Sequence, residues 1–182
     1  LAVDALRPRT LLNSTGTTEA VLMGTERPGQ DPALGRAGYA QGVIVVERPI
    51  WYVLGGLFTA GGSIEWFRRA MAPGADYDTL VAEAAAAPAG SLGVGFLPHL
   101  RLGTAPLPDA RARGAFFGLS KDVTRGCLFR AVLEGIAAAS RRCAEGMLEL
   151  LPAAPPDEIR VIGGLTRNGL YMAIKAAVMG RP

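Results

Sequence analysis

The sequence predicts an α/β domain with a mixed sheet and flanking helices. Short β-branched runs come first along the chain, and patterns of helical period are inserted after them. The chain closes on a strand, a glycine turn and a helix over residues 158–179, which is half of a βαβ unit. With 182 residues, 49% of them apolar, and no internal repeat, we predict one domain over residues 1–182.

The first strands form a hairpin around a Gly-Thr turn. Strand-like residues 10–14 and 19–23 flank the turn at Thr15–Thr18. Residues 1–6 predict the tail of a helix, and the Gly- and Pro-rich residues 27–37 predict a loop. The remaining β-branched or aromatic runs predict further strands over 43–46, 50–54, 94–97 and 158–162.

The predicted helices begin at polar residues that can cap free backbone amides. The first begins at Ser63 as its N-cap and ends at the Pro73-Gly74 pair. Residues 98–113 hold three prolines and predict a long loop, which in a compact domain usually has a function. The second predicted helix has Asp76 or Asp78 as its cap and ends at Ala87. The third has Asp122 or Thr124 as its cap and ends near Leu151, and the last spans Asn168–Met179.

Composition excludes several classes of function. The net charge is +3 and the arginines are scattered, which argues against a nucleic-acid partner. No apolar run is long enough to span a membrane, and no leader follows Leu1, so we expect no signal peptide. Cys127 and Cys143 would lie about 24 Å apart on one helix, which predicts free thiols and fits a cytoplasmic location. His99, the one histidine, is interpreted as a packed or solvated loop residue, and no metal cluster is expected.

Three glycine-centred turns remain as candidate binding elements. They are Ser14–Thr18, Ala60–Ser63 and Gly163–Asn168. Backbone amides and hydroxyls at such turns can cradle phosphates, and a helix start adds a partial positive charge. Each turn alone is better interpreted as structural, but the three together in one small α/β domain indicate a nucleotide site. The Walker A motif, the dinucleotide fingerprint and the nucleophile elbow are absent.

The order of several motifs resembles the FGGY family of carbohydrate kinases, which includes glycerol kinase and xylulokinase. The matching runs are AGGSIEWFRR at 60–69, FLP at 96–98, ARGAFFGL at 112–119, RAVLEGIA at 130–137 and GRP at 180–182. The resemblance covers essentially the whole chain. It implies the ribonuclease H-like fold of the actin, hexokinase and sugar kinase superfamily, in which hairpin tips and strand–helix turns face one nucleotide cleft.

The resemblance also implies a site for ATP with Mg²⁺. Its Gly-Thr hairpin would reach the terminal phosphates, and the turn after the last strand would hold the adenosine. The candidate residues are Gly16, Thr17, Thr18, Gly61, Ile64, Glu65, Gly163, Gly164 and Asn168. Cys127, Leu165, Ala173 and Ala177 depart from the residues usual in the family. We interpret Arg113 and Glu134 as an internal pair that supports the fold.

The resemblance implies phosphorylation of a sugar or polyol hydroxyl, with the catalytic residue outside this chain. In the family a catalytic Asp precedes the Gly-Thr hairpin by a few tens of residues, so it would lie before Leu1. We therefore expect a partial C-terminal domain, incomplete at both ends, that lacks the sugar-binding N-terminal domain and is inactive alone. A homo-oligomer is also expected. Two alternatives stay open: a non-catalytic nucleotide-sensing or scaffold domain, and a helical interaction module built on residues 122–151.

Overall fold

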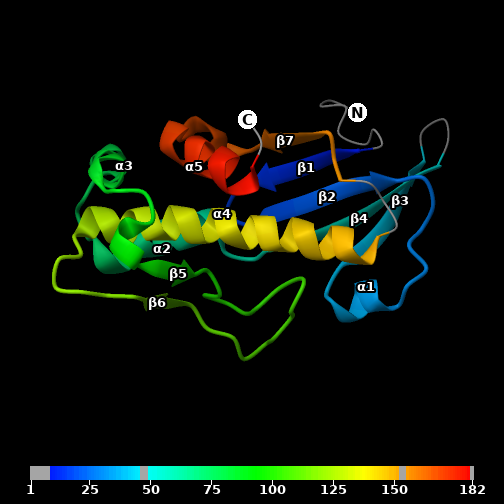
Figure 1. Ribbon diagram of the computed structural model, residues 1–182, viewed down its shortest axis with the longest axis horizontal. Coiled ribbons are helices and arrows are strands. Elements are labelled where there is room, and N and C mark those ends of the chain that lie inside the picture. Colours follow the sequence, from blue (N-terminus) through cyan, green and yellow to red (C-terminus); the bar gives the residue numbers. More distant parts are fainter. Residues whose placement is uncertain (1–8, 46–48, 152–154, 181–182) are drawn as a thin grey trace.

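The computed structural model describes residues 9–45, 49–151 and 155–180, and its fold is the predicted mixed sheet with flanking helices (Figure 1). The expected helix at 1–6, Val46 and most of the 180–182 motif lie outside the described residues. The strands are β1 (Thr10–Thr15), β2 (Glu19–Thr25), β3 (Ala40–Val45), β4 (Pro49–Leu57), β5 (Gly95–Leu97), β6 (Ala115–Phe117) and β7 (Glu158–Ile162). The helices are α1 (Ala33–Arg36), α2 (Ala60–Met71), α3 (Tyr77–Ala86), α4 (Arg125–Leu150) and α5 (Gly169–Met179), with 3₁₀ turns η1 (Ser91–Gly93) and η2 (Gly164–Arg167).

The main sheet has the strand order β3-β4-β2-β1-β7. Only the pair β1–β7 is parallel, and the other neighbours are antiparallel. Inward-facing residues alternate along β1 and β2, as a sheet covered on one face requires. Their register places Leu11 opposite Met23, Asn13 opposite Val21 and Thr15 opposite Glu19. This face packs against α4 and α5.

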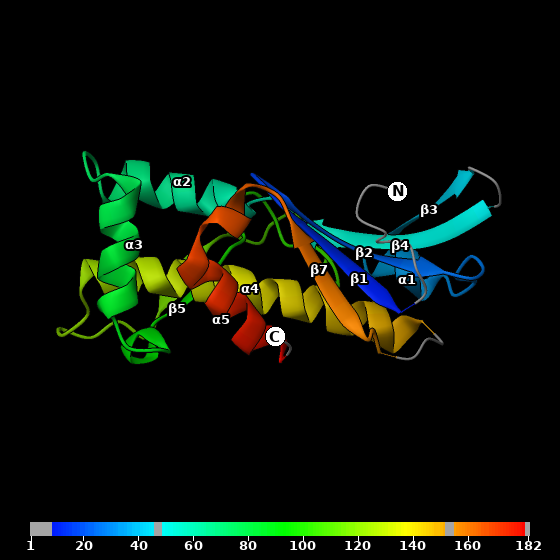
Figure 2. The same ribbon diagram turned by 90° about the horizontal axis from the view of Figure 1, so that it is seen from above.

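Helix α4 runs along the length of the molecule and joins two hydrophobic clusters (Figures 1 and 2). Thr124 caps its start by accepting a hydrogen bond from the Cys127 amide, as predicted. Its first half packs against α2, α3 and β5, where the Phe67 and Phe129 ring centroids are 5.2 Å apart. Its second half packs against the sheet, Leu34 and Tyr39. Because buried residues occur along all of α4, the helical interaction module loses its basis.

Four predictions need correction. Helix α2 begins at Ala60 instead of Ser63, whose hydroxyl donates to the Thr59 carbonyl inside the first turn. The expected loop at 27–37 contains α1, because Leu34 is buried in the core. The short strand β6 was not predicted, and it pairs with β5.

The fourth correction concerns Glu134. Glu134 supports the fold as expected, but its partner is Arg130, with Nε and Oε1 2.8 Å apart. Its carboxylate also accepts hydrogen bonds from the Gly90 amide and the Ser91 hydroxyl, both at 3.0 Å. Arg113 is exposed and donates to loop carbonyls instead.

Both cysteines are buried and free, as predicted. Burial raises the pKa of the Cys143 thiol to about 12, so this thiol stays protonated at neutral pH. None of the helices in the described part of the chain combines the length and the apolar character needed to cross a bilayer.

Candidate nucleotide-binding site

The turn between β1 and β2 forms an exposed hairpin tip. Gly16, Thr17 and Thr18 are exposed, whereas Thr15 and Glu19 on either side are buried. The Gly16 amide donates to the Thr18 carbonyl at 2.8 Å, which closes the turn. Within the described residues, the amides and hydroxyls of Thr17 and Thr18 have no hydrogen-bond partner. The tip therefore presents several donors to a ligand.

The sequence predicted that the backbone amides at the start of α2 would bind a phosphate. In the structure, the amides of Gly61 and Gly62 support the hairpin instead. The Gly61 amide donates to the Gly16 carbonyl at 2.9 Å, and the Gly62 amide donates to the Thr17 carbonyl at 3.0 Å. A Cβ atom at Gly61 would lie 2.5 Å from the Gly16 carbonyl oxygen. Glycine is therefore required for this close approach.

The third turn lies against the other side of the hairpin. Ser14 pairs with Ile162 across the parallel strands, so the next residue, Gly163, reaches the backbone of Thr15. Gly163 has a φ of 108°, and a Cβ atom there would collide with the Thr15 carbonyl. A Cβ atom at Gly164 would meet open space. The structure thus brings together the three predicted turns at one end of the sheet (Figure 2).

The other predicted residues differ in how much of their side chains a ligand could reach. Ile64 is 5% exposed and packs in the core around α4, and its contact with a nucleotide stays a prediction. Glu65 is exposed and pairs with Arg68. Asn168 is 5% exposed; its amide nitrogen donates to the Tyr77 hydroxyl, and its oxygen caps α5 at the Tyr171 amide. Contact of Glu65 or Asn168 with a nucleotide stays a prediction.

A buried polar cluster beneath the hairpin was missed by the sequence analysis. We call it the hairpin anchor, and its members are Asn13 (β1), Glu19 (β2), Ser140 (α4), Tyr171 and Lys175 (both α5). The alternation of β2 places Glu19 on the same inward face as Val21 and Met23, and this acidic residue at a core position was the available signal.

The charges of the hairpin anchor are paired. Lys175 Nζ lies 2.9 Å from Glu19 Oε1, 3.1 Å from Ser140 Oγ and 3.1 Å from the Tyr171 hydroxyl. The Tyr171 hydroxyl donates to Glu19 Oε2 at 3.1 Å, and Asn13 donates to Oε1 at 2.9 Å. Ser140 also contacts this carboxylate. Every ionised group here is hydrogen-bonded, as burial of charge demands.

Burial sets the protonation behaviour of the anchor. Desolvation lowers the pKa of the Lys175 ammonium, and the Glu19 carboxylate opposes this by favouring the charged form. Desolvation and, to a lesser extent, the negative charge of Glu19 raise the pKa of Tyr171. Tyr171 therefore stays protonated and keeps its donor for Glu19 at neutral pH.

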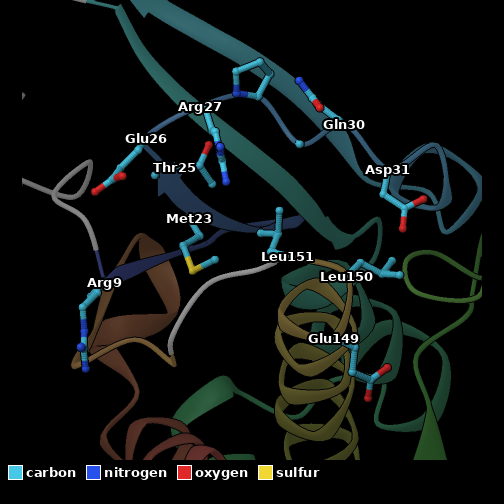
Figure 3. A pocket seen from close by; sticks show the side chains of 13 residues that line it. Arg9, Met23, Thr25, Glu26, Arg27, Gln30, Asp31, Glu149, Leu150 and Leu151 are labelled. Atoms are coloured by element: carbon cyan, nitrogen blue, oxygen red, sulfur yellow. The ribbon is translucent and has the colours of Figure 1, made fainter.

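Two cavities lie away from the three turns. One, of about 1120 Å³, is lined by Arg9, the segment Met23–Asp31 and Glu149–Leu151, at the opposite end of β1 and β2 from the hairpin (Figure 3). The other, of about 500 Å³, lies between α4, β5 and the 98–107 loop, with apolar walls that include Phe96 and Phe117. Among the described residues, no group of three or more acidic, histidine or cysteine side chains could hold a metal.

Solved structures identify the fold. A xylulose kinase from Brucella ovis superposes with a TM-score of 0.85 at 24% identity, over 97% of this chain and 35% of that chain. A xylulose kinase from Rhodospirillum rubrum gives a TM-score of 0.84 at 28% identity, over 99% and 35% respectively. The protein therefore has the actin- and hexokinase-like fold of the sugar kinases.

Sequence comparison identifies the family. Residues 11–182 match the C-terminal domain of the FGGY family of carbohydrate kinases. A glycerol kinase from Trichlorobacter lovleyi is 33% identical over 97% of this chain and 35% of its own length. A glycerol kinase from Gloeobacter violaceus is 38% identical over 70% of this chain and 25% of its own length. The chain belongs to the FGGY family of carbohydrate kinases, and it spans about a third or less of the length of these relatives.

Proposed function

We propose that this chain is the nucleotide-binding part of an ATP-dependent carbohydrate kinase that phosphorylates a sugar or polyol hydroxyl. The convergence of the other two glycine turns on the exposed hairpin tip carries the proposal. Membership of a family of carbohydrate kinases supports it. The sugar contacts and a catalytic Asp would come from polypeptide that precedes Leu1, so the isolated chain would phosphorylate nothing. We also propose that the complete kinase is cytoplasmic and forms a homo-oligomer.

The hairpin would act on the terminal phosphates of ATP. The amides and hydroxyls of Thr17 and Thr18 would donate to the phosphate oxygens, on which negative charge is concentrated during transfer. Gly163 and Gly164 would accept the adenosine, because Gly164 leaves its surroundings open. Glu65 would also line the nucleotide. It is exposed on α2 and is the charged side chain nearest in sequence to the glycines that support the hairpin.

Magnesium would enter with the nucleotide. Mg²⁺ keeps several waters and is commonly held through substrate phosphates with one or two carboxylates. The described residues provide donors for the phosphate oxygens that would carry the ion. When bound, Mg²⁺ would neutralise charge on the phosphates.

An ADP-release assay on the complete protein tests this function. We expect strong release with one class of compound in a panel of glycerol, ketopentoses, deoxyketoses and sugar acids, because a kinase must match one acceptor hydroxyl. A Gly61→Val variant should lose most of this activity, because its side chain would push the Gly16 carbonyl out of place.

The matched control for that assay is Gly35→Val, since a Cβ atom at Gly35 meets nothing within 4 Å. Background rates with every compound, together with retained ATP binding, would favour the non-catalytic nucleotide-sensing or scaffold domain instead.

A further inference from the structure

We propose that the hairpin anchor is a positioning device: it fixes the position of the Gly-Thr hairpin relative to the terminal phosphates of the bound nucleotide. This inference rests on the proposed function, because it assigns positioning residues to the same nucleotide site. Glu19, Ser140, Tyr171 and Lys175 do not reach the surface, so they would act only through the hairpin.

The position of Glu19 in the chain is the first argument. Glu19 directly follows the exposed tip, and its register partner across the hairpin is Thr15. Thr18 of the tip and Glu19 are thus joined by one peptide bond. A displacement of the Glu19 side chain would move the base of the hairpin and, with it, Thr17 and Thr18. Displacements on the order of 1 Å can cost a phosphoryl-transfer site about 100-fold in rate.

The elements that hold Glu19 are the second argument. Ser140 belongs to α4, the central helix, and Lys175 belongs to α5, which starts directly after the third turn. Tyr171 joins two turns by itself: its amide donates to Asn168 at 3.0 Å, and its hydroxyl donates to Glu19 at 3.1 Å. The anchor therefore couples the phosphate turn to the predicted adenosine turn.

The chemistry of the anchor is the third argument. Apolar side chains of similar volume would fill this space without the desolvation cost of two charges. Four donors converge on one carboxylate, and such contacts fix distance and direction, which apolar packing does not. The α2 amides hold the tip from one side and Gly163 from the other, so the anchor supplies the remaining restraint from below.

A pair of Tyr→Phe variants in the complete protein tests the positioning role. Y171F removes the donor to Glu19 and an acceptor of Lys175, whereas Y39F removes a buried bond from the Tyr39 hydroxyl to the Cys143 carbonyl at 2.7 Å, in the other hydrophobic cluster. We expect a lower Tm in both, because each loses a buried hydrogen bond. Only Y171F should raise the KM for ATP, by about tenfold, with the KM for the sugar unchanged.

A lower Tm with unchanged ATP kinetics in Y171F would overturn the positioning role and leave a structural one. If Y171F does not fold, S140A gives the second test, with the same expected increase of the KM for ATP. If the wild-type protein binds ATP but phosphorylates nothing in the panel, the ratio of ATP dissociation constants replaces the KM ratio. If the wild type binds no ATP, the proposed function is wrong and the positioning role is wrong with it.

Discussion

Replacing Lys175 with methionine is expected to lower the Tm of the chain by roughly 6–20 °C. The variant leaves the Glu19 carboxylate fully buried without its cation, and loss of one partner of a buried ion pair costs about 3–5 kcal/mol. For a domain of this size, each kcal/mol shifts the Tm by roughly 2–4 °C. Thermal unfolding followed by circular dichroism measures the effect.

Two controls separate the buried pair from charge in general. The double variant E19L/K175M should recover most of the lost Tm, because apolar residues of similar volume often replace a buried pair at little cost. K121M should change the Tm by less than about 2 °C, because Lys121 is 90% exposed and its pair with Asp122 is a surface pair. A Tm of K175M close to that of K121M would show that Glu19 does not depend on Lys175.

Gly163→Ala is expected to weaken both the fold and nucleotide binding. At a φ of 108° an alanine costs on the order of 1–3 kcal/mol, and its Cβ would also collide with the Thr15 carbonyl. Relief of that collision must move β1 or the turn, and either movement separates two of the three site turns. Isothermal titration of ATP with Mg²⁺ into the complete protein should give an affinity reduced about tenfold or more.

Gly169→Ala is the matched control for that substitution. Gly169 is the first residue of α5, and a Cβ atom there meets nothing within 4 Å. This variant should be neutral or more stable by up to about 1 kcal/mol, because alanine is the better helix former. A Gly163→Ala variant that behaves like Gly169→Ala in both Tm and ATP affinity would contradict the packing of the third turn on the hairpin.

The secondary structure was largely predictable because local patterns and core packing agree. Inward-facing residues alternate along β1 and β2, and Thr124 and Asp76 are caps of the expected kind. The start of α2 was not predictable from propensity, because glycines at 61 and 62 disfavour a helix. They are tolerated there since their amides bond the hairpin carbonyls, and that contact exists only in the tertiary structure.

The candidate site was predictable only in part, because its glycine turns are local patterns whereas their convergence is a tertiary contact. The three turns could be found from glycine spacing and from resemblance to the family. Their convergence depends on the parallel pairing of β1 with β7, between residues far apart in the chain. The pairing of Glu19 with Lys175 likewise depends on the placement of α5 against β2, so no local pattern joins the two residues. Only the acidic residue at an inward position of β2 pointed to it.

A crystal structure of the complete protein with ADP and Mg²⁺ tests the central claim most directly. The account predicts the β-phosphate within hydrogen-bond distance of Thr17 or Thr18, and the adenosine against Gly163 and Gly164. A nucleotide bound elsewhere, for example in the cavity walled by Phe96 and Phe117, with the hairpin tip uncontacted, would contradict it.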